Sequence, residues 1–226
     1  MVEIGLGGGV LTRALLASGA RVLAWELDPA WALATAQRFA GEDRLEIVVG
    51  DALELPWARV PAPVRVVGNL PYNVATPLID RVLDCGDRLG RAAFLVQLEV
   101  ALRLVAEPGS KAYGALSVLT RARAETRVLS RVSAGNFVPP PKVESAIVGF
   151  EPRSPAMAAA AFRALRTVVH AAFGQRRKTL RNALSTRWPK PVVVAAIESA
   201  GLPAAVRAEE LALTDFEALL NLLQSV

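Results

Sequence analysis

Cysteine and histidine are nearly absent from this sequence, and their scarcity excludes several kinds of chemistry. The 226 residues include a single cysteine, Cys85, and a single histidine, His170. One cysteine cannot form an internal disulfide or a cysteine-rich zinc site. Ser-His or Cys-His catalysis and histidine-based metal centres are also poorly supplied. We therefore expect a cytoplasmic protein that holds no metal ion.

The sequence also lacks a long apolar segment. Hydrophobic residues make up 53% of the chain, which is enough for a sizeable core. Stretches such as Pro191–Ile197 are nevertheless far too short to cross a bilayer. Glycines and a glutamate arrive within the first nine residues, unlike the pattern of a signal peptide. These features predict no membrane association and either one large domain or a medium domain with a small one.

Acidic residues are missing from one part of the chain. Residues 1–150 contain 16 Lys and Arg against 15 Asp and Glu, whereas residues 151–226 contain 10 against 6. Within the second part, Phe162–Lys190 holds eight basic residues and no acidic one. Such a segment is typical either of a surface that binds nucleic acid or of an ordinary solvated helical face. Charge alone favours the two readings equally.

Strand and helix patterns alternate through the first two thirds of the chain. The predicted strands cover residues 1–4, 21–25, 45–49, 64–67, 92–97, 125–129 and 145–150, and the predicted helices cover 11–18, 29–39, 76–83 and 100–105. This order predicts an α/β fold with a mostly parallel, Rossmann-like sheet and helices on both faces. After Pro152 the pattern becomes helical, at 156–173, 175–187, 192–200 and 215–223. We therefore expect a first domain over residues 1–152 and a small all-helical domain over residues 153–226.

A glycine-rich loop follows the first predicted strand, in the sequence VEIGLGGGVLT of residues 2–12. Glycines between a strand and a helix let a ligand approach the backbone at the positive end of the helix. The G-x-G-x-G spacing, with Glu3 before it, fits S-adenosylmethionine enzymes better than dinucleotide-binding ones. A tight turn without a ligand would give the same loop, so the loop alone is a weak signal.

Two acidic residues stand just past the ends of the next two strands, where open α/β sheets bind ligands. Glu26 can accept both ribose hydroxyls of a nucleoside, and Asp51 can accept the amino group of adenine. Each alone is more often a helix cap or a solvated loop acid. Together with the glycine loop they favour a bound adenosyl group, with a nicotinamide dinucleotide as the weaker alternative.

The fourth strand ends in Asn69-Leu70-Pro71-Tyr72. The amine of adenine is a poor nucleophile because its lone pair is delocalised into the ring, and two acceptors on its hydrogens would localise that pair. The Asn69 side-chain oxygen and the Leu70 carbonyl can be these acceptors, since Pro71 restricts the backbone of Leu70. Tyr72 can stack on the base. The alternative reading is a strand-to-loop turn with a buried tyrosine.

Six segments together resemble the small-subunit ribosomal RNA adenine N6,N6-dimethyltransferase family: EIGLGGGVLT, GDALELPW, GNLPYNVATPL, KAYGALSV, FVPPPKVESAIV and FGQRRKTLRNAL. The resemblance runs along the whole chain and implies a class I S-adenosylmethionine-dependent methyltransferase fold with S-adenosyl-L-methionine as cofactor. The candidate cofactor-binding residues are then Glu3, Gly5, Gly7, Glu26, Asp51 and Asn69. The candidate catalytic residues are Asn69, Leu70, Pro71, Tyr72 and Phe137, the last closing over the other face of the adenine. The candidate RNA-binding residues are Arg176, Arg177, Lys178 and Arg181.

The resemblance also implies a substrate. Members of the family place two methyl groups on N6 of each of two adjacent adenosines, in a hairpin loop near the 3′ end of small-subunit rRNA. The expected partner is the immature small ribosomal subunit, and the expected form is a monomer. Two alternatives stay open: a large-subunit rRNA adenine N6-methyltransferase of the macrolide-resistance type, and a non-catalytic factor for small-subunit assembly. KAYGALSV and FGQRRKTLRNAL argue against the large-subunit enzyme.

The sequence begins later than the family pattern. By resemblance, a segment with a G-Q-N-F-L motif and a helix precedes the strand of Glu3, where it covers the cofactor and helps to line the adenine pocket. An upstream start codon, a trimmed chain or a real loss would each give the present sequence. The cofactor affinity and the activity of this chain depend on which of these applies.

Overall fold

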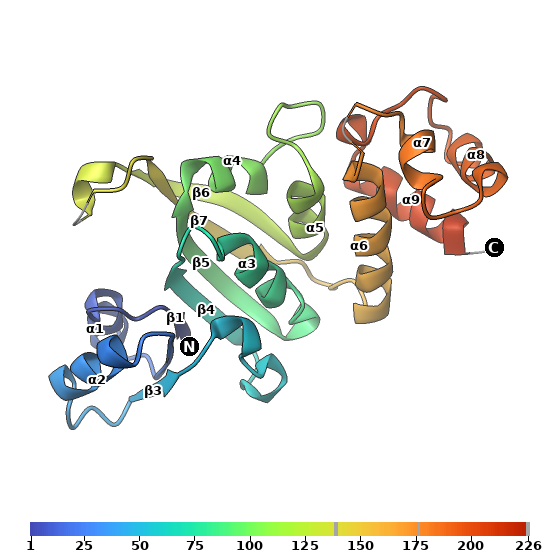
Figure 1. Ribbon diagram of the computed structural model, residues 1–226. Coiled ribbons are helices and arrows are strands. Elements are labelled where there is room, and N and C mark those ends of the chain that lie inside the picture. The colour runs from blue at the N-terminus through green and yellow to red at the C-terminus, as the bar shows by residue number, and fades with distance from the viewer. Residues whose placement is uncertain (138–139, 176, 225–226) are drawn as a thin grey trace. The chain divides into compact units, whose positions relative to one another are not determined.

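The computed structural model describes residues 1–137, 140–175 and 177–224 (Figure 1). Seven strands form one sheet in the order β3-β2-β1-β4-β5-β7-β6. The first five strands are parallel to one another, and β7 is antiparallel to both β5 and β6. The strands are β1 Val2–Ile4, β2 Val22–Glu26, β3 Leu45–Val49, β4 Val64–Asn69, β5 Leu89–Gln97, β6 Ala124–Val132 and β7 Ser145–Pro152. The predicted α/β fold with a mostly parallel sheet is confirmed.

Helices connect the strands and make up most of the chain after residue 154. They are α1 Val10–Ala17, α2 Pro29–Arg38, α3 Ala75–Leu83, α4 Leu98–Leu104, α5 Ala115–Arg123, α6 Ala159–Phe173, α7 Leu180–Leu184, α8 Lys190–Ser199 and α9 Leu213–Gln224. Short 3-10 turns lie at Ala52–Glu54 (η1), Trp57–Arg59 (η2), Gly86–Arg88 (η3), Ala134–Asn136 (η4) and Ala208–Glu210 (η5). None of the helices in the described ranges is long and apolar enough to span a membrane.

The central strands are covered on one face by apolar packing. In β4, Val64 and Val66 are buried while Arg65 between them is exposed, as the period of two in a strand requires. The same alternation runs along β5, whose buried Phe94 and Val96 lie on the face that α3 covers. One face of these strands is therefore core, and the side chains on the other face are half-buried or exposed.

The approach of β4 to β1 is unusually close and depends on a glycine. A Cβ atom at Gly68 would lie 2.7 Å from the carbonyl oxygen of Ile4, a distance that side chains do not tolerate. One residue further along each strand, a Cβ at Gly5 would lie 3.6 Å from the carbonyl oxygen of Asn69. The end of β4 and the glycine loop after β1 are thus direct neighbours.

The two antiparallel strands bring a long connection to the same edge. Ser145, the first residue of β7, pairs with Gln97 at the end of β5 and with Val132 at the end of β6. The connection 133–144, which carries Phe137, therefore leaves and re-enters the sheet at the carboxyl ends of the parallel strands. Ligands of α/β sheets bind at that edge.

The chain divides into two compact units, of which the first comprises Met1–Ala101 with Ala124–Ser154 and the second Leu102–Arg123 with Pro155–Val226. Helix α5 belongs to the second unit, where it packs against α6 and α9 and buries Leu116, Val118 and Leu119. The sequence grouped residues 102–123 with the strands around them, because no pattern showed which apolar surface would cover α5. A separate helical domain with its own RNA-binding role stays a prediction.

Candidate active site

The glycine loop between β1 and α1 adopts backbone conformations that favour glycine. Gly5, Gly7 and Gly9 have φ values of 73°, 46° and 75°. A Cβ at Gly9 would lie 2.7 Å from the ring of Phe39, so this position must stay bare for the loop to pack. A Cβ at Gly7 would meet nothing within 4 Å. The loop is therefore packed at Gly9 and borders open space at Gly7, as a ligand cradle requires.

Two residues of α2 hold the loop in this shape. The Thr35 hydroxyl donates a hydrogen bond of 2.7 Å to the Gly7 carbonyl, and the Arg38 guanidinium donates one to the Gly8 carbonyl. The sequence analysis did not find this role, because a contact across 28 or 30 residues leaves no local pattern. The spacing of three on one helix was the only available signal.

Glu26 is the last residue of β2, and its carboxylate contacts the glycine loop. One carboxylate oxygen accepts the Gly7 N–H at 2.9 Å, and the other accepts the Asp28 N–H at 3.0 Å. The residue is 8% exposed. Since a carboxylate oxygen can accept two hydrogen bonds, both oxygens keep capacity for the two hydroxyls of a ribose. The structure thus places Glu26 beside Gly7, as the sequence predicts.

Glu3 is a buried carboxyl group with one unsatisfied oxygen. Its Oε2 accepts a hydrogen bond of 2.8 Å from the hydroxyl of Thr12 in α1. Its Oε1 is buried and has no hydrogen-bond partner among the described residues. Burial raises the pKa of Glu3, the hydrogen bond from Thr12 opposes that rise, and the charge of Glu26 adds to it. Glu3 Oε1 is thus a buried polar atom whose hydrogen-bonding capacity is left unused within the described residues.

Asp51 stands at the end of β3 and caps the short turn η1. Its Oδ1 accepts the Leu53 N–H at 2.9 Å, which is the capping role that the sequence left open as an alternative. The residue is exposed, and the second oxygen is not used by this cap. Capping and ligand binding are therefore compatible at Asp51. The turn fixes the carboxylate at the carboxyl edge of the sheet.

The segment Asn69-Leu70-Pro71-Tyr72 leaves the sheet directly beside the glycine loop. Asn69 ends β4 with an exposed side chain, whereas the side chain of Leu70 is buried and its N–H donates to the Leu95 carbonyl at 3.1 Å. Pro71 accepts the Val74 N–H at 3.1 Å, which closes the turn. Tyr72 is 37% exposed, and its hydroxyl lies 3.0 Å from the hydroxyl of Ser145. A partly open aromatic ring and an exposed amide thus flank a buried, fixed leucine.

Phe137 lies in the connection between β6 and β7, directly after η4. Its N–H donates to the Ala134 carbonyl at 3.2 Å, and its side chain is partly exposed. It forms no ring pair with Tyr72 within the described part of the chain, where the aromatic pairs involve Phe94, Tyr113 and Phe173. The structure brings Phe137 to the correct edge of the sheet, and its contact with a bound base stays a prediction.

The predicted RNA-binding residues belong to the second compact unit. Arg176 lies outside the described residues. Arg177 and Lys178 are exposed and precede α7, which begins only at Leu180, so they stand on a loop and not on the long helix that the sequence predicted. Arg181 lies within α7 and is half-buried. Leu180 and Leu184, one turn apart on α7, are fully buried.

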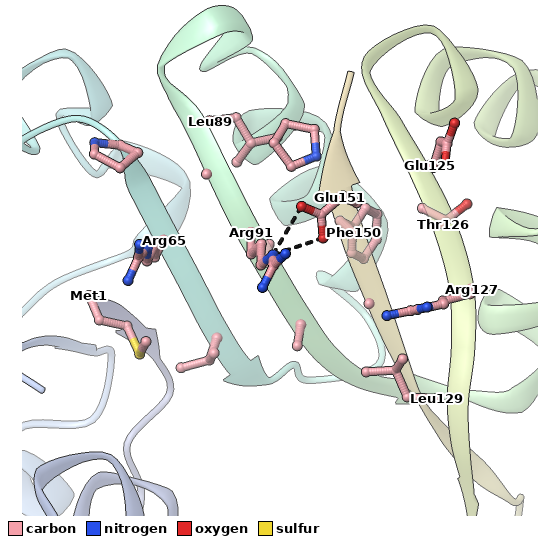
Figure 2. Close-up of a pocket in the computed structure, with 17 residues that line it drawn as sticks. Met1, Arg65, Leu89, Arg91, Glu125, Thr126, Arg127, Leu129, Phe150 and Glu151 are labelled. Carbon is pink, nitrogen blue, oxygen red and sulfur yellow. Dashed lines mark hydrogen bonds and ion pairs between the residues drawn. The ribbon is translucent and has the colours of Figure 1, made fainter. Parts of the chain in front are cut away.

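A hollow of about 860 Å³ lies at the opposite end of the strands (Figure 2). It is lined by Arg65, Arg91, Arg127, Leu129 and Glu151, among others, and Figure 2 shows Arg91 paired with Glu151, at 2.8 Å. Arg65 and Arg91 lie near the amino ends of β4 and β5, Arg127 and Leu129 lie on β6, and Glu151 lies near the carboxyl end of the antiparallel β7. None of the predicted site residues lines the hollow. Because α/β sheets bind ligands at the carboxyl ends of strands, we assign the candidate active site to the other edge.

The sheet order with a reversed β7, together with a glycine loop after β1, defines a class I methyltransferase. Solved structures agree with this class. The crystal structure of the 23S rRNA methyltransferase ErmE is 27% identical, covers 99% of this chain and 90% of its own, and has a TM-score of 0.73. A dimethyladenosine transferase from Plasmodium falciparum, 24% identical, has the same fold with a TM-score of 0.81 over 96% of this chain and 87% of its own.

Sequence comparison narrows the class to one family. The family model for ribosomal RNA adenine dimethylase matches residues 1–225. Two curated relatives are each named ribosomal RNA small subunit methyltransferase A. The protein from Ruegeria pomeroyi is 46% identical over 97% of this chain and 80% of its own length, and that from Methylococcus capsulatus is 44% identical over 96% and 83%. The chain belongs to the ribosomal RNA adenine dimethylase family.

Proposed function

We propose that this protein dimethylates N6 of two adjacent adenosines in a hairpin loop near the 3′ end of small-subunit rRNA, with S-adenosyl-L-methionine as methyl donor. The observation that carries the proposal is the direct contact between the two halves of the site. The carbonyl of Asn69 lies 3.6 Å from the position of a Cβ on Gly5, so the end of β4 and the cofactor loop share one edge. The match of the family model to residues 1–225 supports the same reaction.

The cofactor site is built from groups that fit an adenosyl ligand with a charged amine. S-adenosyl-L-methionine supplies an electrophilic methyl group when it is bound. Glu26 would accept the ribose hydroxyls and Asp51 the adenine amino group. Gly5 and Gly7 would let the ligand approach the backbone. The unsatisfied oxygen of Glu3 would accept a hydrogen bond from a donor group of the ligand. These donors and acceptors match the ligand without a metal ion.

The chemistry at the target base rests on two acceptors and a stacking face. Asn69 and the Leu70 carbonyl would accept the two hydrogens of the adenine amine, which localises the nitrogen lone pair toward the incoming methyl group. Tyr72 would hold the ring in line, and Phe137 would cover its other face. The N–C bond forms as the S–C bond breaks, and the amine proton leaves to solvent. No histidine or other strong base is needed for this step.

Substrate binding would be shared with the second compact unit. Arg177, Lys178 and Arg181 would neutralise phosphates of the rRNA, and Arg176, outside the described residues, would extend the same run. A hairpin loop suits such an enzyme because its bases are unstacked and enter a pocket at low cost. The proposed partner is the immature small ribosomal subunit, which the protein would bind as a monomer in the cytoplasm.

A second candidate function is methylation of large-subunit rRNA. The structural similarity to ErmE over 99% of this chain favours it. The higher identities of 42–46% to relatives named for the small subunit favour the first candidate. The third reading, a non-catalytic assembly factor, predicts binding to the particle without any methyl transfer.

Transfer of labelled methyl groups to ribosomal particles tests the proposal. We expect label from S-adenosyl-L-methionine to enter 30S particles that lack the modification and not to enter 50S precursors. Asn69→Ala should reduce transfer by at least about 100-fold, because one of two acceptors on the amine is lost. Its circular dichroism and melting temperature should match the parent, since Asn69 is exposed. Asn221→Ala, at an exposed position of α9, is the matched control.

The outcomes separate the candidates. Label in 50S precursors alone would establish the large-subunit reaction. Tight binding of 30S particles with no transfer would establish the assembly factor. Near-normal turnover of Asn69→Ala would refute the role of Asn69 while leaving the family assignment intact.

A further inference from the structure

We infer that Ser145 is a positioning residue, which holds the ring of Tyr72 as a preformed stacking face for the target base. The inference rests on the proposed function and names a residue of the same site. The hydroxyls of Tyr72 and Ser145 lie 3.0 Å apart, although 73 residues separate them in the sequence. Tyr72 follows β4 and Ser145 begins β7, so this hydrogen bond crosses the end of β5, which lies between them.

Because Ser145 is buried, breaking this hydrogen bond is energetically costly. Ser145 is 0% exposed, whereas Tyr72 is 37% exposed. A buried hydroxyl without a partner costs more free energy than the net gain from one ordinary hydrogen bond. If the ring of Tyr72 swung outward, Ser145 would lose the bond that satisfies it. The ring is therefore held at its inner, hydroxyl end while part of it stays open to solvent.

The backbone that carries the Tyr72 side chain is fixed as well. The turn after β4 is closed by the hydrogen bond from the Val74 N–H to the Pro71 carbonyl, and Leu70 is buried beneath it. A tyrosine side chain has two rotatable torsions, so anchoring both ends leaves it little freedom. A stacking face that is fixed before the base arrives adds no ordering cost when the base binds.

The position of Ser145 in the chain adds a second consequence. It is the first residue after the connection 133–144, which carries Phe137, and its strand partners are Gln97 and Val132. The hydroxyl of Ser145 therefore ties the turn that carries Tyr72 to the root of the segment that carries Phe137.

Nuclear magnetic resonance of the full chain tests the contact without any substrate. The sequence contains only two tyrosines, Tyr72 and Tyr113, so labelling tyrosine with ¹³C at Cζ gives two signals. Ser145→Ala should shift the Tyr72 signal and leave that of Tyr113, which is bonded to the Leu211 carbonyl, in place. Ser130→Ala, at an exposed position of β6, should move neither. An unchanged Tyr72 signal in Ser145→Ala would overturn the inference, whatever the activity of the chain.

A double-mutant cycle on methyl transfer tests the positioning role. Ser145→Ala and Tyr72→Phe should each lower kcat about 5-fold, which corresponds to one hydrogen bond, with KM for 30S particles unchanged. The double variant should be no slower than either single one. Independent, multiplicative losses, or a change confined to KM, would overturn the positioning role. Wild-type protein that transfers no methyl group would instead refute the proposed function, and the spectroscopic test would still decide the contact.

Discussion

At the scale of single residues, Glu3 lowers the stability of the free protein when it is ionised, and we propose that it accepts a hydrogen bond when the cofactor is bound. Its carboxyl group is buried, and one oxygen finds no partner in the described parts of the chain. Burial raises the pKa of Glu3 above its ordinary value of 4.5. The folded protein therefore resists the ionisation that the unfolded chain undergoes freely. The stability contributed by Glu3 is present below about pH 4.5 and is lost as the pH rises through its folded pKa.

Glu3→Gln should accordingly have opposite effects on stability and on ligand binding. At about pH 8 the variant should be more stable than the parent, because it keeps an acceptor for Thr12 without a buried charge. At about pH 4 the two proteins should be equally stable. Urea unfolding at both pH values measures this difference. Calorimetry with S-adenosyl-L-methionine should show weaker binding to the variant. A variant less stable than the parent at about pH 8 would contradict the argument.

The residues that the sequence revealed and those that it missed differ in a simple way. Glu26 and Asp51 were found because each stands at the carboxyl end of a predicted strand, and the ends of parallel strands meet at one edge. Thr35, Arg38 and Ser145 were missed because each acts through a partner 28 to 73 residues away. Such contacts depend on strand order and crossover geometry. No local spacing encodes them.

At the scale of elements, the sequence predicts one helix over residues 175–187, whereas the structure has the shorter helix α7 with a basic loop, Arg177 and Lys178, before it. The helix begins at Leu180, where the Thr179 hydroxyl accepts the Asn182 N–H as a cap. A periodic pattern over residues 175–187 could not locate that start, because the cap depends on one hydroxyl and not on apolar spacing. Arg177 adopts a φ of 67°, a conformation that costs a non-glycine residue about 1 kcal/mol. Arg177 and Lys178 therefore present exposed cations, the first from a slightly strained backbone.

Removing these cations should weaken binding to the ribosomal particle in a salt-dependent way. Arg177→Gly with Lys178→Gln should reduce the slope of log affinity against log salt by roughly 2, one for each phosphate that is no longer neutralised. Glycine at position 177 also relieves the strained backbone, so the melting temperature should not fall. Affinities for 30S particles at several salt concentrations measure the slope. Arg21→Gln, an exposed charge at the amino end of β2, is the control. An unchanged slope would exclude this loop from the RNA interface.

At the scale of the whole molecule, the second compact unit is discontinuous in sequence. Helix α5 lies between two strands of the sheet along the chain, yet it packs on α6 and α9. Arg123 lies over the ring of Phe162, 4.0 Å from its centroid, and the Tyr113 hydroxyl donates to the Leu211 carbonyl at 2.7 Å. Burial raises the pKa of Tyr113 to about 12. The segment 102–123 is therefore an integral part of the helical core.

A fragment that begins at residue 153 should consequently fail to fold by itself. It would expose the surfaces of α6 and α9 that α5 normally covers. We expect residues 153–226 alone to show no cooperative thermal transition by circular dichroism. Adding a peptide of residues 102–123 should restore a transition, and a scrambled peptide of equal composition should not. Cooperative unfolding of the fragment alone would support the boundary that the sequence predicted.

This arrangement also orders events during synthesis. The sheet has all of its strands once residue 152 has been made, because β7 is the last strand to enter it. Helix α5 is made earlier, but its partner α9 ends only at Gln224. Helix α6, which ends at Phe173, can cover part of α5 earlier, but the surface of α5 that α9 covers stays exposed until almost the whole chain has been made. A nascent chain that stops before residue 213 would carry every strand of the sheet and still expose the apolar surface of α5 that α9 covers. Proteases and chaperones would then recognise premature termination of this protein by a helix encoded near its middle.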